Sequence, residues 1–496
     1  MMNIGWASRD VSMEGPVLIV GQAMERICKK VQDPTTITTL VMEDGGDYVV
    51  FISGDFTSWE TSFFREIKAA AQERIPGFDG SKIIMNATHT HTAPRFQTKR
   101  GYDKAPRDRV DIIEPGVYRE FLRTKIVDSI VEAWQGRKPG SFSYGYGTAM
   151  VALQRRVTYF NDRSATNIKG NTYGVNGFGQ MYGKTNLDDF DSYEGPTDDF
   201  VYLLYTFDEA GKLTGAIVNT PCPSQCTENE YFTSADFWHE TRQLIREKYG
   251  DIYILPQSAA GGDLSPHPLH AFAAIDREHR LKYSGDNGAY GLIRPREYYN
   301  RKDIARRIAH AFDDCYQWAS KEKFTEAPIV HITKTLELER WNVTDQELQD
   351  AKENYAELQQ RPFQVTDDPV ADYEANTKLS SNMSRCEMVM RNYELNGTPV
   401  PMEIHVLKIG EIAFTTTPVE LYLAYQHRIQ ARSPFVQTFM VQLVATDTKE
   451  DANSYLPTKR AAANKGYSAI MFSCKIAPEG GQVMVDDVVK TLNELQ

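Results

Sequence analysis

Short runs of apolar and β-branched residues dominate the first sixty positions and predict strands there. The clearest runs are 35–42 and 48–53, and the intervening Asp44–Asp47, with its two glycines, predicts a turn that joins them as a hairpin. The same pattern of two apolar runs around a turn predicts hairpins in two later segments, 202–218 and 403–414. Single buried strands are predicted at 82–85, 252–255 and 439–445.

Apolar residues that recur every three or four positions predict amphipathic helices between these strands. Gly136 supplies a stop signal for one of them, and Asn342–Asp345 supplies a start signal for another. The predicted helical ranges are 58–73, 117–135, 237–249, 301–318, 345–359, 419–431 and 483–495.

This mixture of strands and helices predicts an α/β fold with layered mixed sheets and helices. We find no repeat, no low-complexity tract and no Pro/Gly/Ser linker that would divide the chain, so residues 1–496 are expected to form one catalytic unit. Residues 157–200 are rich in Gly, Asn and Asp and have few periodic apolar positions. They are predicted to form a long surface excursion, and such loops are usually functional or mobile.

Charge and apolar run length exclude several classes of partner. The formal net charge of −12 argues against nucleic-acid binding, which requires a basic face. The longest apolar runs, such as Pro16–Val20, are far too short for an integral membrane segment. The N-terminus has no secretory signal pattern, and six cysteines are too few for a disulfide scaffold, so a cytoplasmic protein is expected. A small-molecule substrate and a homo-oligomer are both compatible with this composition.

The segment Asn86–Pro94 carries the strongest chemical signal. It contains His89 and His91, two of only ten histidines in the chain, flanked by small Thr and Ala residues. Positions i and i+2 on an extended strand end point to the same side, so both imidazoles are expected to face one site. The alternative is that backbone carbonyls at a strand edge satisfy both rings.

Four further loops follow predicted strands and carry small residues together with reactive ones. α/β proteins commonly assemble their sites from loops at strand ends. The loops are Thr220–Gln225, Gly261–His267, Thr416–Glu420 and Asn453–Thr458.

These motifs resemble those of the neutral/alkaline (non-lysosomal) ceramidases, zinc amidases that cleave the N-acyl bond of ceramide. Thr88–Pro94 is close to the family signature THTHSGP, and Gly262–Pro266 is similar to its G-N-x-S-P loop. Pro418-Val419-Glu420 resembles its P-G-E element, and Tyr455 and Tyr467 have the family's twelve-residue spacing. The resemblance covers nearly the whole chain and implies a neutral-ceramidase-like catalytic domain. A divergent member is expected, without the family's secretory leader and C-terminal immunoglobulin-like domain.

The resemblance also implies roles for individual residues. His89, Glu420 and Tyr455 would ligate zinc, and His91 would act beside the metal as a proton donor or substrate contact. Arg155 would stabilise an oxyanion together with Tyr467. Ser265 takes the place of the family's active-site serine, either as a nucleophile or as a residue that orients metal-activated water.

The chain departs from the family at the second histidine ligand. Counting back fourteen residues from Asp236 in Ser234-Ala235-Asp236 gives Cys222, so Cys-Pro-Ser stands where His-Pro-Thr is expected. A thiolate is a good zinc ligand, so Cys222 is a candidate fourth ligand. The alternatives are that the metal is lost, or that it is shifted with His91 or His267 recruited.

Three functions remain open from the sequence. The first is a zinc-dependent hydrolase that directs metal-activated water at an amide or ester carbonyl of a small soluble substrate. The second is true ceramidase activity on N-acyl sphingosine, which requires an apolar groove beside the metal. The third is a catalytically silent binding protein with the same fold, and Cys222 in place of histidine is its main support.

Overall fold

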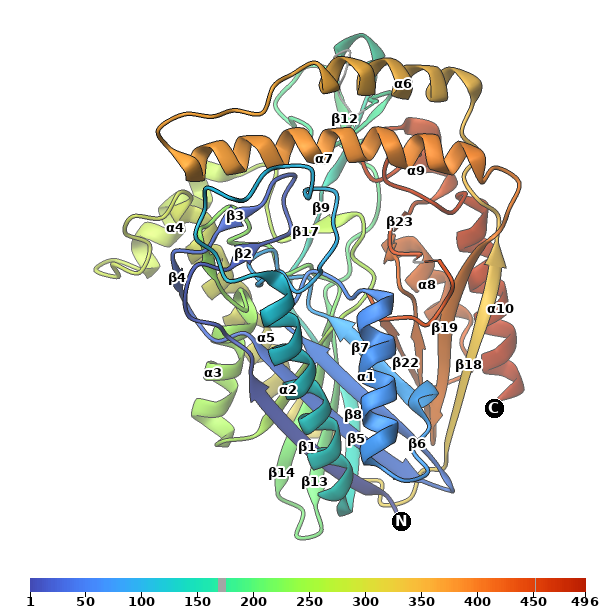
Figure 1. Cartoon of the computed structure of the whole chain (residues 1–496). Coiled ribbons are helices and arrows are strands. Elements are labelled where there is room, and N and C mark those ends of the chain that lie inside the picture. The colour runs from blue at the N-terminus through green and yellow to red at the C-terminus, as the bar shows by residue number, and fades with distance from the viewer. Residues whose placement is uncertain (168–174, 451) are drawn as a thin grey trace.

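The computed structural model describes residues 1–167, 175–450 and 452–496 (Figure 1). Its largest element is an eight-stranded mixed sheet with the order β16-β14-β13-β8-β1-β5-β6-β7. The inner pairs are antiparallel, whereas β14–β16 and β6–β7 are parallel. The strands are β1 (Asn3–Asp10), β5 (Thr36–Asp44), β6 (Asp47–Gly54), β7 (Ile83–Ala87), β8 (Lys138–Thr148), β13 (Phe200–Asp208), β14 (Leu213–Thr220) and β16 (Tyr253–Ser258).

A second, four-stranded sheet packs against this one. Its order is β18-β19-β20-β22, formed by β18 (Ile329–Leu338), β19 (Val400–Ile409), β20 (Ile412–Thr416) and β22 (Gln437–Val441). Apolar side chains of both sheets form one buried cluster, in which the rings of Phe51 and Phe414 lie 5.0 Å apart. The predicted hairpins β5–β6, β13–β14 and β19–β20 are all confirmed.

Helices cover the outer faces of both sheets, so the predicted layered α/β class is confirmed. Helices α1 (Thr61–Arg74) and α2 (Pro115–Gln135) pack on one half of the large sheet, and α3 (Phe237–Tyr249) and α5 (Pro295–Ala319) on the other. Helices α8 (Leu423–Arg432) and α10 (Glu479–Glu494) pack on the small sheet. None of the helices in the described part of the chain is long and apolar enough to cross a membrane.

Two antiparallel helices cross above the strand ends (Figure 1). Helix α6 (Asp345–Gln359) begins at the predicted capping box, in which Thr344 and Glu347 cap one another. Helix α7 (Pro369–Glu394) was not predicted, because polar residues interrupt its apolar periodicity. Its buried Cys386 and Val389 pack against Leu358 of α6, so tertiary contacts stabilise the pair.

The predicted excursion at 157–200 contains three strands, the first of which begins at Arg156. Strands β10 (Arg156–Tyr159), β11 (Gly179–Met181) and β12 (Phe190–Tyr193) form a small antiparallel sheet, while 168–174 lie outside the described residues. The prediction of a long surface excursion did not include these strands, because their apolar runs are too short to detect.

The predicted helix at 419–431 begins later than expected. The chain first forms β21 (Glu420–Leu421), which pairs in parallel with β23 (Tyr455–Leu456), and α8 starts only at Leu423. The remaining elements are short, except α4: β2 (Leu18–Ile19), β3 (Arg26–Ile27), β4 (Lys30–Val31), η1 (Gly80–Lys82), β9 (Leu153–Gln154), η2 (Ser164–Thr166), β15 (Phe232–Thr233), β17 (Leu264–Ser265), α4 (Phe272–Lys282) and α9 (Lys459–Asn464).

Candidate active site

The candidate site lies where several strands end. His89 follows β7, Glu228 follows β14, Ser265 follows β16 and Glu420 follows β20. Each of these four strands pairs in parallel with a neighbour, so loops that are distant in sequence leave the sheets at common edges. The predicted gathering of reactive loops at strand ends agrees with this arrangement.

The backbone feature that orients His89 differs from the predicted one. Strand β7 ends at Ala87, and His89 has a left-handed backbone with φ of 63°, so strand alternation does not orient it. Its Nδ1 lies 2.7 Å from the Thr57 carbonyl oxygen, and its Nε2 lies 3.4 Å from Oε2 of Glu420. The carbonyl contact fixes the ring with Nε2 directed at the carboxylate.

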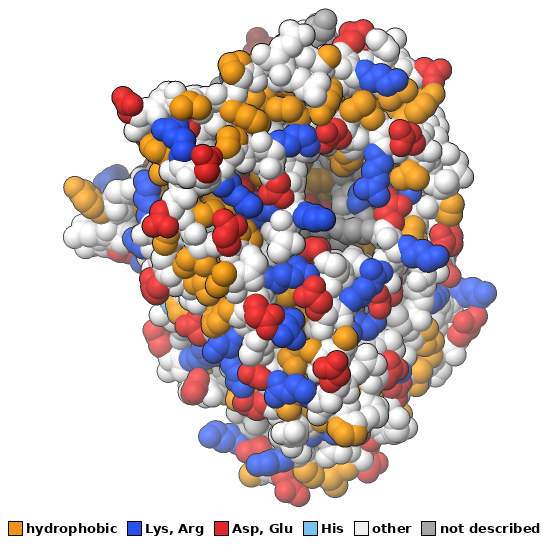
Figure 2. All heavy atoms as spheres, in the orientation of Figure 1, with side chains coloured by type: hydrophobic (Ala, Val, Ile, Leu, Met, Phe, Trp, Pro, Cys, Tyr) orange, Lys and Arg blue, Asp and Glu red, His pale blue; other side chains and the backbone are white. Residues whose placement is uncertain are grey.

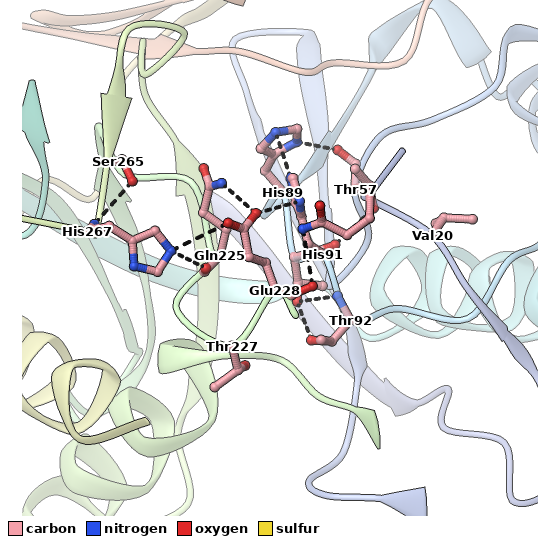
Figure 3. A network of polar contacts seen from close by, with 12 residues as sticks. Val20, Thr57, His89, His91, Thr92, Gln225, Thr227, Glu228, Ser265 and His267 are labelled. Atoms are coloured by element: carbon pink, nitrogen blue, oxygen red, sulfur yellow. Dashed lines mark hydrogen bonds and ion pairs between the residues drawn. The ribbon is translucent and has the colours of Figure 1, made fainter. Parts of the chain in front are cut away.

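His91 lies beside His89 with the two ring planes nearly perpendicular, and their Nε2 atoms are 3.3 Å apart. Its Nδ1 lies 3.2 Å from Oε2 of Glu228. Glu228 also lies 3.7 Å from Nε2 of His267, so one carboxylate stands between two imidazoles (Figure 3). The Gln225 side chain holds Glu228 in place by donating a hydrogen bond of 3.0 Å to Oε2.

Arg155 is buried and approaches the same carboxylate oxygen of Glu420 as His89 does. Its Nη2 donates to the carbonyl of Gly262 at 2.8 Å and to the hydroxyl of Tyr455 at 3.3 Å, and it lies 3.6 Å from Oε2 of Glu420. Glu420 and Tyr455 are directly paired positions on β21 and β23. The Tyr455 ring meets the Tyr467 ring edge-on, with centroids 5.6 Å apart.

Ser265 lies next to His267 and Tyr182. Its Oγ accepts a hydrogen bond from the backbone N–H of His267 at 3.1 Å and one from the Tyr182 hydroxyl at 3.3 Å. Tyr182 in turn accepts a hydrogen bond from Nη1 of Arg155 at 3.3 Å. Ser265 therefore connects to the candidate site through Tyr182 and Arg155.

Backbone contacts lock the loop of Ser265 to the segment of Glu420. A Cβ on Gly262 would lie 2.4 Å from the Glu420 carbonyl oxygen, so only glycine permits this close approach. Asp263 accepts hydrogen bonds from the Leu423 N–H at 2.9 Å and from Nε2 of Gln154 at 3.0 Å. Asp263 thus positions the chain around Glu420.

Cys222 lies in a different environment from the other predicted ligands. Its thiol is buried and donates to the Val151 carbonyl at 3.2 Å, and burial raises the pKa of the Cys222 thiol well above its ordinary value. Within the described part of the chain, no contact joins its sulfur to His89, Glu420 or Tyr455. Its role as a ligand stays a prediction.

The electrostatics of the site follow from burial and pairing. Burial acts to lower the pKa of His89, but Glu420 and the Thr57 carbonyl outweigh it and raise this pKa above its ordinary value. Burial acts to raise the pKa of Glu420, but His89 and Arg155 lower it overall. The pKa of His91 is lowered by burial despite Glu228. Burial and Glu420 raise the pKa of Tyr455 well above its ordinary value.

The site forms the floor of a cavity of about 440 Å³. His89, His91, Glu420, Tyr455 and Tyr467 all line it. Its walls come from the Gly21 loop, residues 100–102, α7 and residues 472–475. This volume suits a small organic molecule.

The donors at the cavity floor suit a zinc ion. They are an imidazole nitrogen, a carboxylate oxygen and a phenol oxygen, and zinc accepts nitrogen and oxygen ligands. The hydrogen bond from His89 Nδ1 to a carbonyl is the outer contact typical of metal-binding histidines. Across 1–167, 175–450 and 452–496, no three His, Cys, Asp or Glu side chains form a group that could hold a metal ion. The predicted set requires the Tyr455 phenol as its third donor.

Several residues of this network were not singled out from the sequence: Thr57, Tyr182, Gln225 and Glu228. Each is a common residue type in a loop or short strand, and only its spatial position relative to His89, His91 or Arg155 distinguishes it. Glu228 lies three residues beyond the predicted reactive loop Thr220–Gln225, and no local sequence pattern distinguishes it.

The sequence matches no protein-family model and no curated protein. Solved structures do match. The crystal structure of neutral ceramidase from Pseudomonas aeruginosa has a TM-score of 0.65 and 16% identity, covering 99% of this chain and 75% of that one. A ceramidase complexed with C2 has a TM-score of 0.63 and 15% identity, covering 100% of this chain and 75% of that one. Because the likeness covers nearly the whole chain, the chain has a neutral ceramidase-like fold.

Proposed function

We propose that this protein is a zinc-dependent hydrolase of an amide or ester bond in a small substrate. The observation that carries the proposal is the convergence of His89, Glu420 and Tyr455 at the floor of one cavity, with His91 3.3 Å from His89. Three separate segments of the chain bring these side chains together. The location of the protein in the cytoplasm and the organisation of 1–496 as one unit stay predictions.

In this proposal, His89 Nε2, the Glu420 carboxylate and the Tyr455 hydroxyl hold the zinc ion. Three protein ligands leave a coordination position open, which distinguishes a catalytic zinc site from a structural one. When bound, zinc lowers the pKa of water and polarises a carbonyl. Cys222 is not part of the proposed ligand set, because its thiol faces the Val151 carbonyl.

The other residues then take complementary roles. His91, held by Glu228 at 3.2 Å, is placed to move a proton between the attacking water and the leaving group. Arg155, 3.6 Å from Glu420, and Tyr467, which lines the cavity beside Tyr455, would stabilise an oxyanion, and one such donor is worth about 3 kcal/mol of barrier. Ser265 orients Arg155 through Tyr182 and is not the nucleophile in this scheme.

Metal analysis combined with turnover tests the proposal. Purified protein, stripped with a chelator and reloaded with zinc, is assayed on a panel of N-acyl amides and aryl esters. We expect about one zinc per chain, hydrolysis only by the loaded protein, and loss of both in a Glu420→Gln variant. A protein that binds no zinc, or that hydrolyses equally well after stripping, contradicts the proposal and favours a silent binding protein.

A second candidate is ceramidase activity on N-acyl sphingosine. The structural likeness to neutral ceramidase favours it, although at 16% identity it concerns the fold alone. Including a short-chain and a long-chain ceramide in the same panel separates the two candidates. A higher kcat/KM for either ceramide than for every small amide and ester would favour this second candidate.

A further inference from the structure

A second cavity, of about 640 Å³, lies at the opposite end of the small sheet from the candidate active site. Gln437 and Thr438, the first residues of β22, are in its lining. The parallel neighbour of β22 is β20, which leads from its other end to Glu420. None of the described residues that line this second cavity also lines the cavity above Glu420, so the two are separate.

Aromatic side chains from several segments form the walls of this cavity, which we name the aromatic groove. They include Tyr144 and Tyr146 of β8, Phe200 of β13, Trp318 of α5 and Phe324. Tyr146 meets Phe200 and Trp318 edge-on, with ring centroids 5.0 and 6.4 Å away, so these rings enclose space at steep angles instead of forming one flat stack. The same three side chains are 51%, 41% and 46% exposed, and a ligand therefore has access to their rings.

The lining of the aromatic groove is acidic. Glu322 is the only charged side chain among the described residues that line it. A second carboxylate, that of Glu411, accepts a hydrogen bond from the hydroxyl of Tyr144. Burial, Glu411 and Glu322 all raise the pKa of Tyr144, so this phenol stays neutral. Over the face drawn in Figure 2, by contrast, acidic and basic side chains are interspersed.

Two helices end at the aromatic groove. Helix α5 ends at Ala319 and helix α8 at Arg432, and both Ala319 and Ala431 are in the lining. The carboxyl end of a helix carries a partial negative charge, which attracts cations. The last turn of α5, all of it described, contains no basic residue, and Arg432 of α8 is paired with Asp486 at 2.6 Å. Both helix ends therefore add to the negative potential of Glu322.

Lysines near the groove do not cancel this potential. Lys408, which lies over an aromatic ring of the lining, donates a hydrogen bond to the Leu495 carbonyl at 2.5 Å. Lys323 donates to the Gly211 carbonyl at 3.0 Å. Lys321 is exposed, and neither it nor the other two lysines is among the described residues of the lining. The groove thus combines aromatic walls with a negative potential.

We propose that the aromatic groove binds a small organic ammonium ion, whose cationic head lies against the rings of Tyr146 and Trp318 and near the Glu322 carboxylate. Aromatic faces attract a cation that lies within about 6 Å of the ring centroid. A bare metal ion is less suited to this lining, because it requires several oxygen, nitrogen or sulfur ligands. A neutral apolar molecule gains nothing from Glu322 or from the two helix ends. The proposal concerns a separate site and does not rest on the proposed hydrolase function.

A charged probe and its neutral isostere test the proposal. Choline and 3,3-dimethylbutan-1-ol have the same shape, but the first carries a quaternary nitrogen where the second has a carbon. Calorimetric titration of the full chain at fixed salt concentration measures the affinity for each. We expect one choline site per chain and a choline affinity at least about tenfold higher than that for the alcohol, since several rings and a carboxylate act on the charge.

Variants assign the binding to the aromatic groove. Tyr146→Leu removes one wall and is expected to weaken choline binding by about 3- to 30-fold, the range of a cation–aromatic contact. Glu322→Gln removes only the charge and is expected to weaken choline binding by about 2- to 5-fold without affecting the alcohol. The matched controls are Tyr290→Leu and Glu326→Gln, because both residues are exposed and neither lines the groove. Circular dichroism checks that each variant folds.

The outcomes distinguish the aromatic groove from the other cavity. Choline binding that persists in Glu420→Gln and weakens in Tyr146→Leu and Glu322→Gln supports the proposal. Equal affinity for choline and the alcohol, no saturable choline binding, or an affinity unchanged in both groove variants overturns it. Loss of choline binding in Glu420→Gln alone also overturns it, because the cation would then occupy the cavity above the proposed zinc site. Since none of these titrations requires turnover, their results are independent of the hydrolase proposal.

Discussion

Two pairs of histidines touch one another in this protein, and their surroundings differ. His89 and His91 line the cavity, and each has a carboxylate beside it, Glu420 or Glu228. His331 of β18 and His405 of β19 are buried between the sheets, with Nε2 of His331 2.9 Å from Nδ1 of His405. Their ring contacts are with each other, the Tyr48 carbonyl and the Thr333 hydroxyl.

Glu420 distinguishes His89 from the other three rings, whereas the pKa of His91 stays lowered by burial although Glu228 lies beside it. At the cavity, Glu420 raises the pKa of His89 against the effect of burial. Between the sheets, burial lowers the pKa of His331 to about 4, and burial with its histidine neighbour lowers that of His405 well below its ordinary value. Contact between two imidazoles therefore does not identify a functional site. His89 and His91 differ from the buried pair because a cavity gives a ligand access to their rings and a carboxylate lies beside each of them.

Substitution of His89 in the cavity is the most direct test of this comparison. His89→Ala removes one of the proposed zinc donors, so we expect kcat/KM to fall by at least about 10³-fold with only a small change in unfolding free energy. Steady-state kinetics, zinc analysis and urea unfolding measure these effects. The control is His239→Ala, on α3, which is outside the cavity lining. Full activity in His89→Ala would place the chemistry elsewhere.

The buried pair is expected to act on stability. Because the folded-state pKa of His331 lies near 4, below the ordinary value of 6.5, the folded protein holds this ring neutral. The resulting stability is present above about pH 6.5 and is lost as pH falls toward 4, by up to about 1.4 kcal/mol per pH unit for one ring. Urea unfolding from pH 7 to 4.5 measures this slope.

A His331→Gln variant sharpens this point. It is expected to be less stable than the parent at pH 7 and to show a shallower loss between pH 6.5 and 4.5, because one titrating ring is gone. Zinc-loaded activity at pH 7 should remain within about twofold, since surface and core changes far from a site usually act through stability alone. An unchanged slope would show that His331 is already protonated in the folded state.

Glu228 tests whether the carboxylate partner of His91 matters. Glu228→Gln keeps the size of the side chain but removes the charge beside Nδ1 of His91, so we expect kcat to fall by about 10- to 100-fold, the range for groups that orient a functional histidine. The pH profile of kcat should also shift, which a purely structural role would not produce. The matched control is Glu387→Gln, which removes the ion pair between Glu387 on α7 and Lys104.

The smallest effect is expected for Cys222. Because its thiol faces the Val151 carbonyl, Cys222→Ser should change zinc content and kcat/KM by less than about threefold. Loss of zinc in this variant would support Cys222 as a zinc ligand, as the family spacing predicts. The result separates a three-ligand site from a four-ligand one.

The sequence by itself determined the main secondary structure and the loops that carry the chemistry. Alternating and helical periodicities predicted the three hairpins and helices α1, α2, α3 and α6 because each pattern reports a locally buried face. The THTH segment and the loops of Ser265, Glu420 and Tyr455 were identified because glycine, proline and reactive residues cluster where strands end.

Only the tertiary structure decided how these loops meet. The left-handed backbone of His89, the direct pairing of Glu420 with Tyr455 and the position of Glu228 beside His91 depend on contacts between segments more than 30 residues apart. The same holds for α7, a helix of weak apolar periodicity that packing on α6 stabilises. This helix brings Arg385 to the cavity. Local sequence patterns record which face of an element is buried, but they carry no record of which distant side chain lies against it.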